Sequence, residues 1–214
     1  MGDDFIRVTK SPEVRRKELR DISEQLFLEK GYEQTMVSDI VRKADVAQGT
    51  FYYYFKSKEA VLDEITDKYI SIIVESMETI SKDENLTPIE KLVKIFHFSL
   101  SFSDDTRGVM QYVHNEKNVH LQRKFQQRIP FETVGPLAHI FKEGVEEGIF
   151  NTPYPEDAAK AFNGISGMVL QGIDSADHNP EEIKRKFIVI FDFIERILGA
   201  ESGAISKAFM EMVV

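Results

Sequence analysis

Apolar residues recur every three and four positions along almost the whole chain, and this spacing restricts the fold more than any other feature. It is the repeat of one face of an α-helix, and no segment shows the alternation of a half-buried β-strand. The prolines lie mostly at the edges of these periodic segments, although Pro130 and Pro136 should kink one of them. We therefore predict an all-α protein. A short helix of about ten residues should begin after residue 35, and the other helices should cover about 12–30, 48–55, 58–82, 88–103, 105–117, 119–147, 155–176 and 181–198.

The composition is that of a folded protein from a reducing compartment. The chain has 214 residues, 42% of them hydrophobic, which is enough to bury a core. It contains no cysteine, which excludes disulfides, thiolate zinc sites and cysteine nucleophiles. The first ten residues lack the apolar stretch of a signal peptide, and no apolar run is long enough to span a bilayer. We expect a cytoplasmic protein with no membrane contact.

The net charge of −9 is unevenly distributed. Residues 1–56 hold ten basic and ten acidic residues, whereas residues 57–214 hold 17 basic and 26 acidic residues. Because a polyanion is bound through Lys and Arg, only the first quarter of the chain could approach nucleic acid. We predict two domains, 1–56 and 57–214, linked by the helix that starts near residue 58.

The first three predicted helices form a compact pattern. Ser11 and Pro12 are typical of a helix start, and Gly31 of a helix end. A short helix follows Thr35, a residue type that caps helices, and a turn at Asp45 leads to the third helix. Two short helices joined by a tight turn and packed on a longer one form a tri-helical DNA-binding arrangement.

The outward face of the helix over 48–55 is suited to DNA. If the inward residues are Phe51, Tyr54 and Phe55, the helical repeat turns Gly49, Tyr52 and Tyr53 outward, flanked by Gln48 and Thr50. Tyr hydroxyls can donate to phosphates, Gln can read adenine, Thr can contact a thymine methyl, and Gly allows close approach. The alternative is a packed aromatic cluster, but three consecutive tyrosines cannot all be buried on one face.

Arg15 to Leu62 includes LFLEKGYEQTMVSDIVRKADVAQGTFYYYFKSKEAVL, which resembles the DNA-binding segment of TetR family repressors. The resemblance covers 48 of 214 residues. It implies a homodimer that binds double-stranded, palindromic operator DNA and a small-molecule effector that lowers this affinity. The DNA-binding residues it implies are Thr35, Ser38, Gln48, Gly49, Thr50, Tyr52, Tyr53 and Lys58, with Lys58 holding a phosphate.

The segment departs from the family pattern at three positions. Asp45 stands where the family often has a turn glycine, and aspartate tolerates left-handed geometry better than most residues. Ala47 stands where a serine commonly caps the third helix, and Ser38 replaces a frequent basic residue. These departures predict moderate DNA affinity and a shallow dependence on salt.

The helix over 181–198 has an apolar stripe too wide for one buried side, and the preceding segment offers small residues for close helix packing. We predict that both helices pair with their symmetry mates through Phe162, Ile165, Met168, Phe187, Ile190, Phe191 and Ile194. The alternative is that both helices belong only to the core of one chain.

Large aromatic side chains and the two central prolines predict a site for an apolar or aromatic ligand in the C-terminal domain. The candidate residues are Phe96, His97, Met110, Gln111, His114, Phe125, Phe131, Phe162 and Asn163.

The sequence gives little support for other classes of function. Glu116, His120 and His114 have helical spacing for metal ligands but form no complete set, so we expect neither metal nor cofactor. The chain lacks GxSxG, GxGxxG and P-loop patterns, so we do not expect an enzyme. One alternative remains, a helical adaptor protein that does not bind DNA. Salt distinguishes it from a DNA-binding regulator, because DNA binding weakens as the salt concentration rises.

Overall fold

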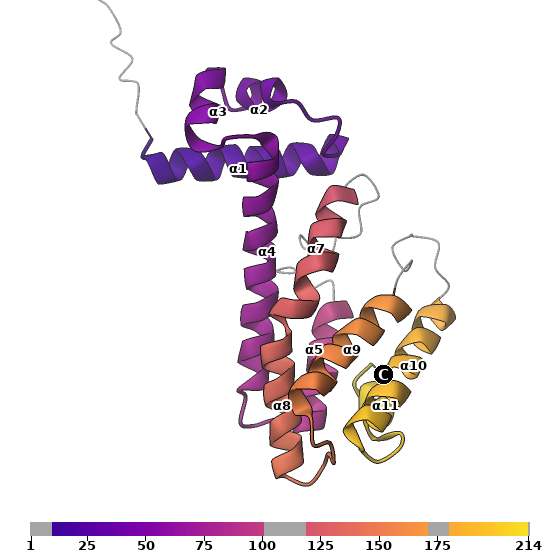
Figure 1. The fold of residues 1–214 in the computed structure, drawn as a ribbon. Coiled ribbons are helices and arrows are strands. Elements are labelled where there is room, and N and C mark those ends of the chain that lie inside the picture. Colours follow the sequence, from indigo (N-terminus) through magenta and orange to yellow (C-terminus); the bar gives the residue numbers. More distant parts are fainter. Residues whose placement is uncertain (1–9, 101–118, 171–179, 214) are drawn as a thin grey trace, which may run out of the picture. The chain divides into compact units, whose positions relative to one another are not determined.

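The computed structural model describes residues 10–100, 119–170 and 180–213. Over these ranges the chain is helical and has no strand, which confirms the predicted fold class (Figure 1). The helices are α1 (Pro12–Lys30), α2 (Val37–Lys43), α3 (Gln48–Tyr54), α4 (Lys58–Ser81), α5 (Pro88–Leu100), α7 (Val119–Glu132), α8 (Val134–Glu146), α9 (Pro155–Val169), α10 (Pro180–Leu198) and α11 (Ala204–Val213).

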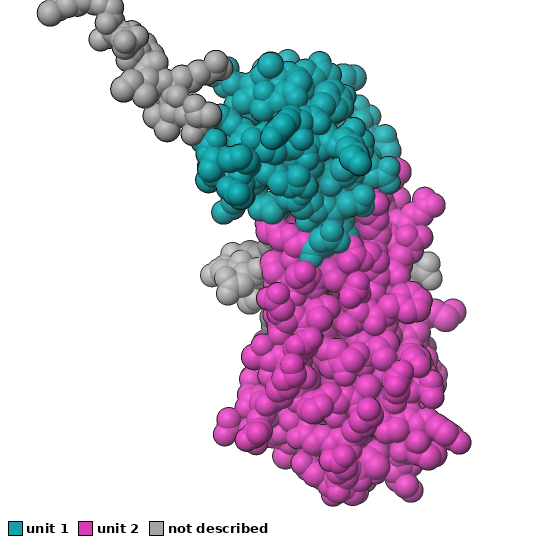
Figure 2. Space-filling view, turned by 60° about the vertical axis from the view of Figure 1, so that its left-hand side comes forward, with its two compact units in different colours: residues 1–67 teal, residues 68–214 magenta. Residues whose placement is uncertain are grey.

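The chain forms two compact units, which Figure 2 distinguishes by colour. Unit 1 is Met1–Asp67 and unit 2 is Lys68–Val214, so the division falls inside α4. The sequence predicts the domain boundary before that helix, at residue 56. The boundary between the two functional domains stays a prediction.

The ends of α1 follow from its local sequence. Ser11 accepts a hydrogen bond from the backbone N–H of Val14, and Pro12 occupies the first helical position, where no N–H is needed. At the other end Gly31 has φ 88°, and its N–H donates to the carbonyl of Phe27 at 2.9 Å. Glycine accepts this left-handed geometry at little cost, so the helix ends where the sequence predicted.

Unit 1 has one small core, to which each of its helices contributes. The buried side chains are Leu19, Leu26 and Phe27 of α1, Ile40 and Val41 of α2, Phe51 of α3, Phe55, and Val61, Leu62 and Ile65 of α4. In Figure 1, α2 and α3 lie side by side on one side of α1, in agreement with their contacts. This is the predicted tri-helical arrangement.

Ion pairs reinforce the core of unit 1. Arg16 contacts Glu64 of α4 at 2.6 Å, and its Nη1 donates to the carbonyl of Tyr54 at 2.9 Å. The same guanidinium lies 4.6 Å from the centre of the Phe55 ring. Arg20 also reaches Glu64, at 3.5 Å. These contacts join α1, the end of α3 and α4.

Unit 2 is a helical bundle around a phenylalanine cluster. α8 packs on α9 and α5, while α10 packs on α9 and α11. The ring of Phe96 lies edge to face with those of Phe162 at 5.4 Å and Phe191 at 4.7 Å. Edge-to-face pairs of this kind add stability beyond the burial of apolar area.

The predicted helix over 119–147 is two helices. It breaks at Thr133, between Pro130 in α7 and Pro136 in the first turn of α8. Nδ2 of Asn163 donates to the carbonyl of Pro130 at 2.8 Å and to the Thr133 hydroxyl at 3.0 Å. A residue of α9 therefore satisfies polar groups at the break.

The sequence analysis missed α11. Its buried residues Ile205 and Phe209 share one face, and the Phe209 ring packs on Phe191 at 4.9 Å. Glu195 of α10 is 3% exposed and accepts hydrogen bonds from the backbone N–H groups of Gly203, Ile205 and Ser206. This carboxylate satisfies N–H groups at the start of α11, which have no partner within the helix.

Among the residues that the structure describes, no helix combines the length and the apolar character needed to cross a bilayer.

Replacing Glu195 by Gln should lower the free energy of unfolding by about 1–3 kcal/mol, because buried N–H groups would lose a charged acceptor. Urea denaturation followed by circular dichroism measures the change. Glu201→Gln is the control, since Glu201 is exposed just before α11. Equal stability of the two variants would contradict the role of Glu195.

Candidate nucleic-acid interface

The turn between α2 and α3 has the geometry that its sequence predicted. Asp45 has φ 53°, the only positive value at a non-glycine residue among those described. An aspartate can adopt this left-handed conformation, and so it replaces the glycine expected at the turn. The N-cap of α3 is Ala47, which makes no side-chain hydrogen bond, as its residue type predicted.

α3 presents the predicted face to solvent. Phe51 and Phe55 are buried, Tyr54 is half-buried, and the side chains of Tyr52 and Tyr53 are 50% and 78% exposed. Gln48 and Gly49 are also exposed, and Thr50 is half-buried. The surface of α3 thus offers hydrogen-bonding and stacking groups.

Neighbouring rings restrict the exposed tyrosines. Tyr52 lies edge to face with the buried ring of Phe51, with centroids 5.5 Å apart. Tyr53 packs in the same way on Tyr54 at 4.9 Å. Each exposed ring thus contacts the more buried ring of a neighbouring residue and keeps half or more of its own surface open to solvent.

Lys58 makes internal contacts, and its contact with a phosphate stays a prediction. Its Nζ donates to the carbonyls of Tyr32 at 2.6 Å and Thr35 at 2.9 Å. It also lies 4.1 Å from the centre of the Tyr32 ring. Burial lowers the pKa of Lys58 from its ordinary value, and the charge of Glu33 opposes this shift. Lys58 therefore ties the start of α4 to the turn between α1 and α2.

Thr35 is likewise an internal residue. Its side chain is 1% exposed, and its hydroxyl donates to the carbonyls of Gly31 at 2.8 Å and Leu26 at 3.2 Å. The predicted contact of this side chain with DNA is corrected accordingly. Ser38, the other predicted residue near the start of α2, is exposed.

Asp39 caps α2 in place of Thr35, a role that the sequence analysis missed. Its carboxylate accepts a hydrogen bond from the N–H of Met36 at 3.2 Å and forms ion pairs with Lys30 at 3.2 Å and Arg42 at 2.6 Å. The bond from Met36, followed by that from Lys30, lowers the pKa of Asp39. The sequence signal for this capping role is an acidic residue in the first turn of a helix.

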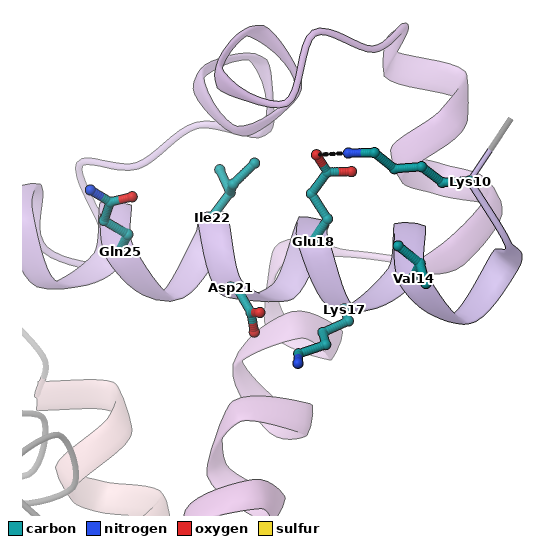
Figure 3. A pocket seen from close by; sticks show the side chains of 7 residues that line it. All are labelled: Lys10, Val14, Lys17, Glu18, Asp21, Ile22 and Gln25. Atoms are coloured by element: carbon teal, nitrogen blue, oxygen red, sulfur yellow. Dashed lines mark hydrogen bonds and ion pairs between the residues drawn. The ribbon is translucent and has the colours of Figure 1, made fainter. Parts of the chain in front are cut away.

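A depression open to solvent lies along α1. Figure 3 shows its lining, in which Lys10 pairs with Glu18 at 2.6 Å. The remaining residues that line it are Val14, Lys17, Asp21, Ile22 and Gln25.

The described residues predicted to bind a ligand differ in burial, and the ligand site stays a prediction. Phe96, Phe125 and Phe162 are buried, and Phe131, with 79% of its side chain exposed, lies at the surface. His97 is exposed, and Asn163 is half-buried and bonded at the break between α7 and α8. Three further candidates lie outside the described residues: Met110, Gln111 and His114.

Most of the predicted dimer residues lie in the core of the single chain, where they contact its own helices: Phe162, Phe187, Ile190, Phe191 and Ile194. Their assignment to a surface is corrected. Ile165 is half-buried, and Met168 is 79% exposed. Ile188 and Phe193 of α10 are also exposed.

Of the candidate metal ligands, His120 is exposed on α7, and Glu116 and His114 lie outside the described residues. Within the described ranges, no group of three His, Asp or Glu side chains is arranged to hold a metal ion.

Comparisons with known proteins agree with this geometry. Residues 19–65 match the family model for bacterial regulatory proteins of the tetR family. The transcriptional repressor DhaR of Mycobacterium sp. (strain GP1) is 32% identical over 190 residues, which cover 83% of this chain and 90% of DhaR. The fatty acid metabolism regulator protein of Bacillus subtilis is 32% identical over 131 residues, 60% of this chain and 66% of that protein.

Solved structures share the fold. The complex of triclosan with SmeT, a repressor from Stenotrophomonas maltophilia, has a TM-score of 0.61 at 22% identity and covers 86% of this chain and 90% of its own. The similarity to DhaR extends far beyond the tri-helical unit, and the family model covers most of that unit. The chain therefore belongs to the TetR family of helix-turn-helix transcriptional regulators.

Proposed function

We propose that this regulator is a repressor that inserts α3 into the major groove of a palindromic operator and leaves it when a small molecule binds unit 2. The single observation that carries the DNA-binding part is the face of α3. Phe51 is fully buried while Tyr53 is 78% exposed, so the helix is fixed with its polar aromatic side outward. The relative DhaR is named a repressor, which supports the same mode here.

The groups on α3 match the edges of bases and the DNA backbone. The amide of Gln48 can make two hydrogen bonds to adenine, and the methyl of Thr50 can contact that of thymine. The hydroxyls of Tyr52 and Tyr53 can donate to phosphates. Ser38 can add a neutral hydrogen bond from α2.

Gly49 supports a close approach of α3 to the duplex. A Cβ added to Gly49 would meet no atom within 4 Å, so the chain's own packing does not require glycine there. Glycine lowers stability by about 0.5–1 kcal/mol relative to alanine in the middle of a helix, and part of this cost applies to Gly49 in the first turn of α3. A contact outside the protein explains why a glycine stands at this position.

Homodimerisation through the outer faces of α9 and α10 completes the proposal. On α9 the exposed residues Ala161 and Gly164 are small and lie beside exposed Met168. Ile188 and Phe193 of α10 add apolar surface, with side chains 46% and 42% exposed. Exposed apolar groups beside small residues are suited to pairing with a second helix pair.

The effector acts, in this proposal, through α4. This helix runs unbroken from Lys58 to Ser81 and so continues from unit 1 into unit 2. In unit 1 it is bonded to the turn before α2 through Lys58 and to α1 through Glu64. A shift of α4 on ligand binding would therefore pull on the helices that carry α3. The SmeT complex with triclosan and the many phenylalanines of unit 2 favour an apolar or aromatic effector.

Replacing Tyr53 by Ala should weaken binding to the operator about tenfold or more, because hydrogen bonding and stacking at the duplex would be lost. Operator fragments are first selected from genomic DNA with the purified protein, and affinity is then measured by fluorescence anisotropy. Tyr154→Ala is the matched control, because Tyr154 is an exposed tyrosine at the start of α9. Equal affinity of both variants would reject the assigned face of α3.

Gly49→Ala should change stability and binding in opposite directions. We expect the free energy of unfolding to rise by less than the ~0.5–1 kcal/mol of a helix interior, since alanine is the better helix former but residue 49 lies in the first turn of α3. Operator affinity should fall at least severalfold because the added methyl enters the space of the duplex. Unchanged affinity in the more stable variant would show that α3 does not approach the DNA at Gly49.

Ile188→Glu should shift the protein from dimer to monomer in sedimentation velocity at micromolar concentration, because the interface would bury an unpaired charge. Val14→Glu, at an exposed position of α1, is the control and should stay dimeric. A monomeric wild type would reject the dimer, and a dimeric Ile188→Glu would reject this interface.

A further inference from the structure

On the outer face of α2, Ser38 and Arg42 lie one helical turn apart. Ile40 and Val41 are buried, whereas Ser38 and Arg42, four positions apart, are exposed. Residues at this spacing lie on one face of a helix. The side chain of Arg42 is 76% exposed, and its Nη2 donates to Oδ1 of Asp39 at 2.6 Å.

The partner of Arg42 is itself fixed. Asp39 is held by the backbone N–H of Met36 and by Lys30, so its carboxylate has a defined position at the start of α2. A guanidinium has five N–H donors in a planar fork, and its bond to Asp39 uses the Nη2 group. An arginine in this arrangement is oriented and can still donate to an oxyanion.

Two other cations near α3, Lys58 and Lys43, have partners within the protein. Lys58 is bonded to two backbone carbonyls, and Lys43 lies 3.7 Å from Glu29. In Figure 1, α2 lies beside α3 on the same side of α1, so a duplex that receives α3 passes close to α2. A cation on the outer face of α2 would then lie near the DNA backbone.

We propose that Arg42, oriented by Asp39, binds a backbone phosphate next to the groove that α3 enters. The inference rests on the proposed insertion of α3. In this arrangement Arg42 supplies a positive charge on α2, where Ser38 offers only a neutral hydroxyl. Because phosphates carry no sequence information, Arg42 contributes to affinity and not to the choice of operator.

The test compares three variants of the full-length protein by anisotropy at several salt concentrations, on a selected operator duplex and on a scrambled duplex of equal length. Arg42→Gln removes the charge, and Arg42→Lys keeps it without the planar fork. Lys17→Gln is the matched control, because Lys17 is exposed and points to the opposite side of α1 from Glu18 and Ile22 (Figure 3).

Arg42→Gln should weaken binding to both duplexes by about the same factor, roughly tenfold at low salt, and should reduce the slope of log affinity against log salt by about one. Arg42→Lys should keep the wild-type slope with a smaller loss of affinity. Lys17→Gln should behave as wild type. Thermal melting checks that every variant is folded.

An unchanged salt slope in Arg42→Gln, with wild-type protein that binds its operator, would overturn the proposal. An equal loss in Lys17→Gln would also overturn it, because the effect would then be one of net charge. If wild-type protein shows no preference for any selected duplex, the proposed function fails instead, and the two failures are distinguishable.

Discussion

The burial of Phe51 and Phe55 in the small core of unit 1 is the constraint on which the proposed DNA-binding surface depends. Successive residues of a helix point about 100° apart, so anchoring these two rings leaves Tyr52 and Tyr53 outward. Arg16 reinforces the anchor, because it contacts the Phe55 ring and the last carbonyl of α3 while it is paired to Glu64. Most of this surface is thus set by packing within one unit, before any DNA is bound.

The sequence was sufficient to predict the ends of α1, the outward face of α3 and the left-handed residue at the turn, because each depends on neighbouring residues. It was not sufficient for Thr35 and Lys58, whose partners are backbone carbonyls that only the tertiary structure brings near. Both residues have side chains able to contact DNA, and a resemblance transfers a residue type without its surroundings. The internal bonds they make orient the helices that carry the contacts.

The wide apolar stripe of α10 shows how a correct observation led to an incomplete inference. The stripe needs partners on two sides, and the sequence predicted that its second side packs on another copy of the chain. The structure gives much of it to α11, whose Phe209 packs on Phe187 at 5.9 Å and on Phe191 at 4.9 Å. The residues of α10 that can contact a second copy of the chain are the exposed ones, such as Ile188 and Phe193. They lie outside the row of buried residues that forms the centre of the stripe.

The ion pairs of unit 1 bear on how the regulator discriminates between sequences. Arg16 and Arg20 share Glu64, and Lys30 and Arg42 share Asp39. A carboxylate beside a cation stays close to any phosphate that the cation meets and offsets part of the attraction, so each paired cation contributes less than an isolated one. In the proposed function Arg42 still contributes, because its planar fork has donors other than the one bonded to Asp39. A larger share of the proposed operator affinity then falls to contacts of α3 with base edges. The proposed dimer would make the second contact intramolecular, so weak half-sites would still give tight and selective binding.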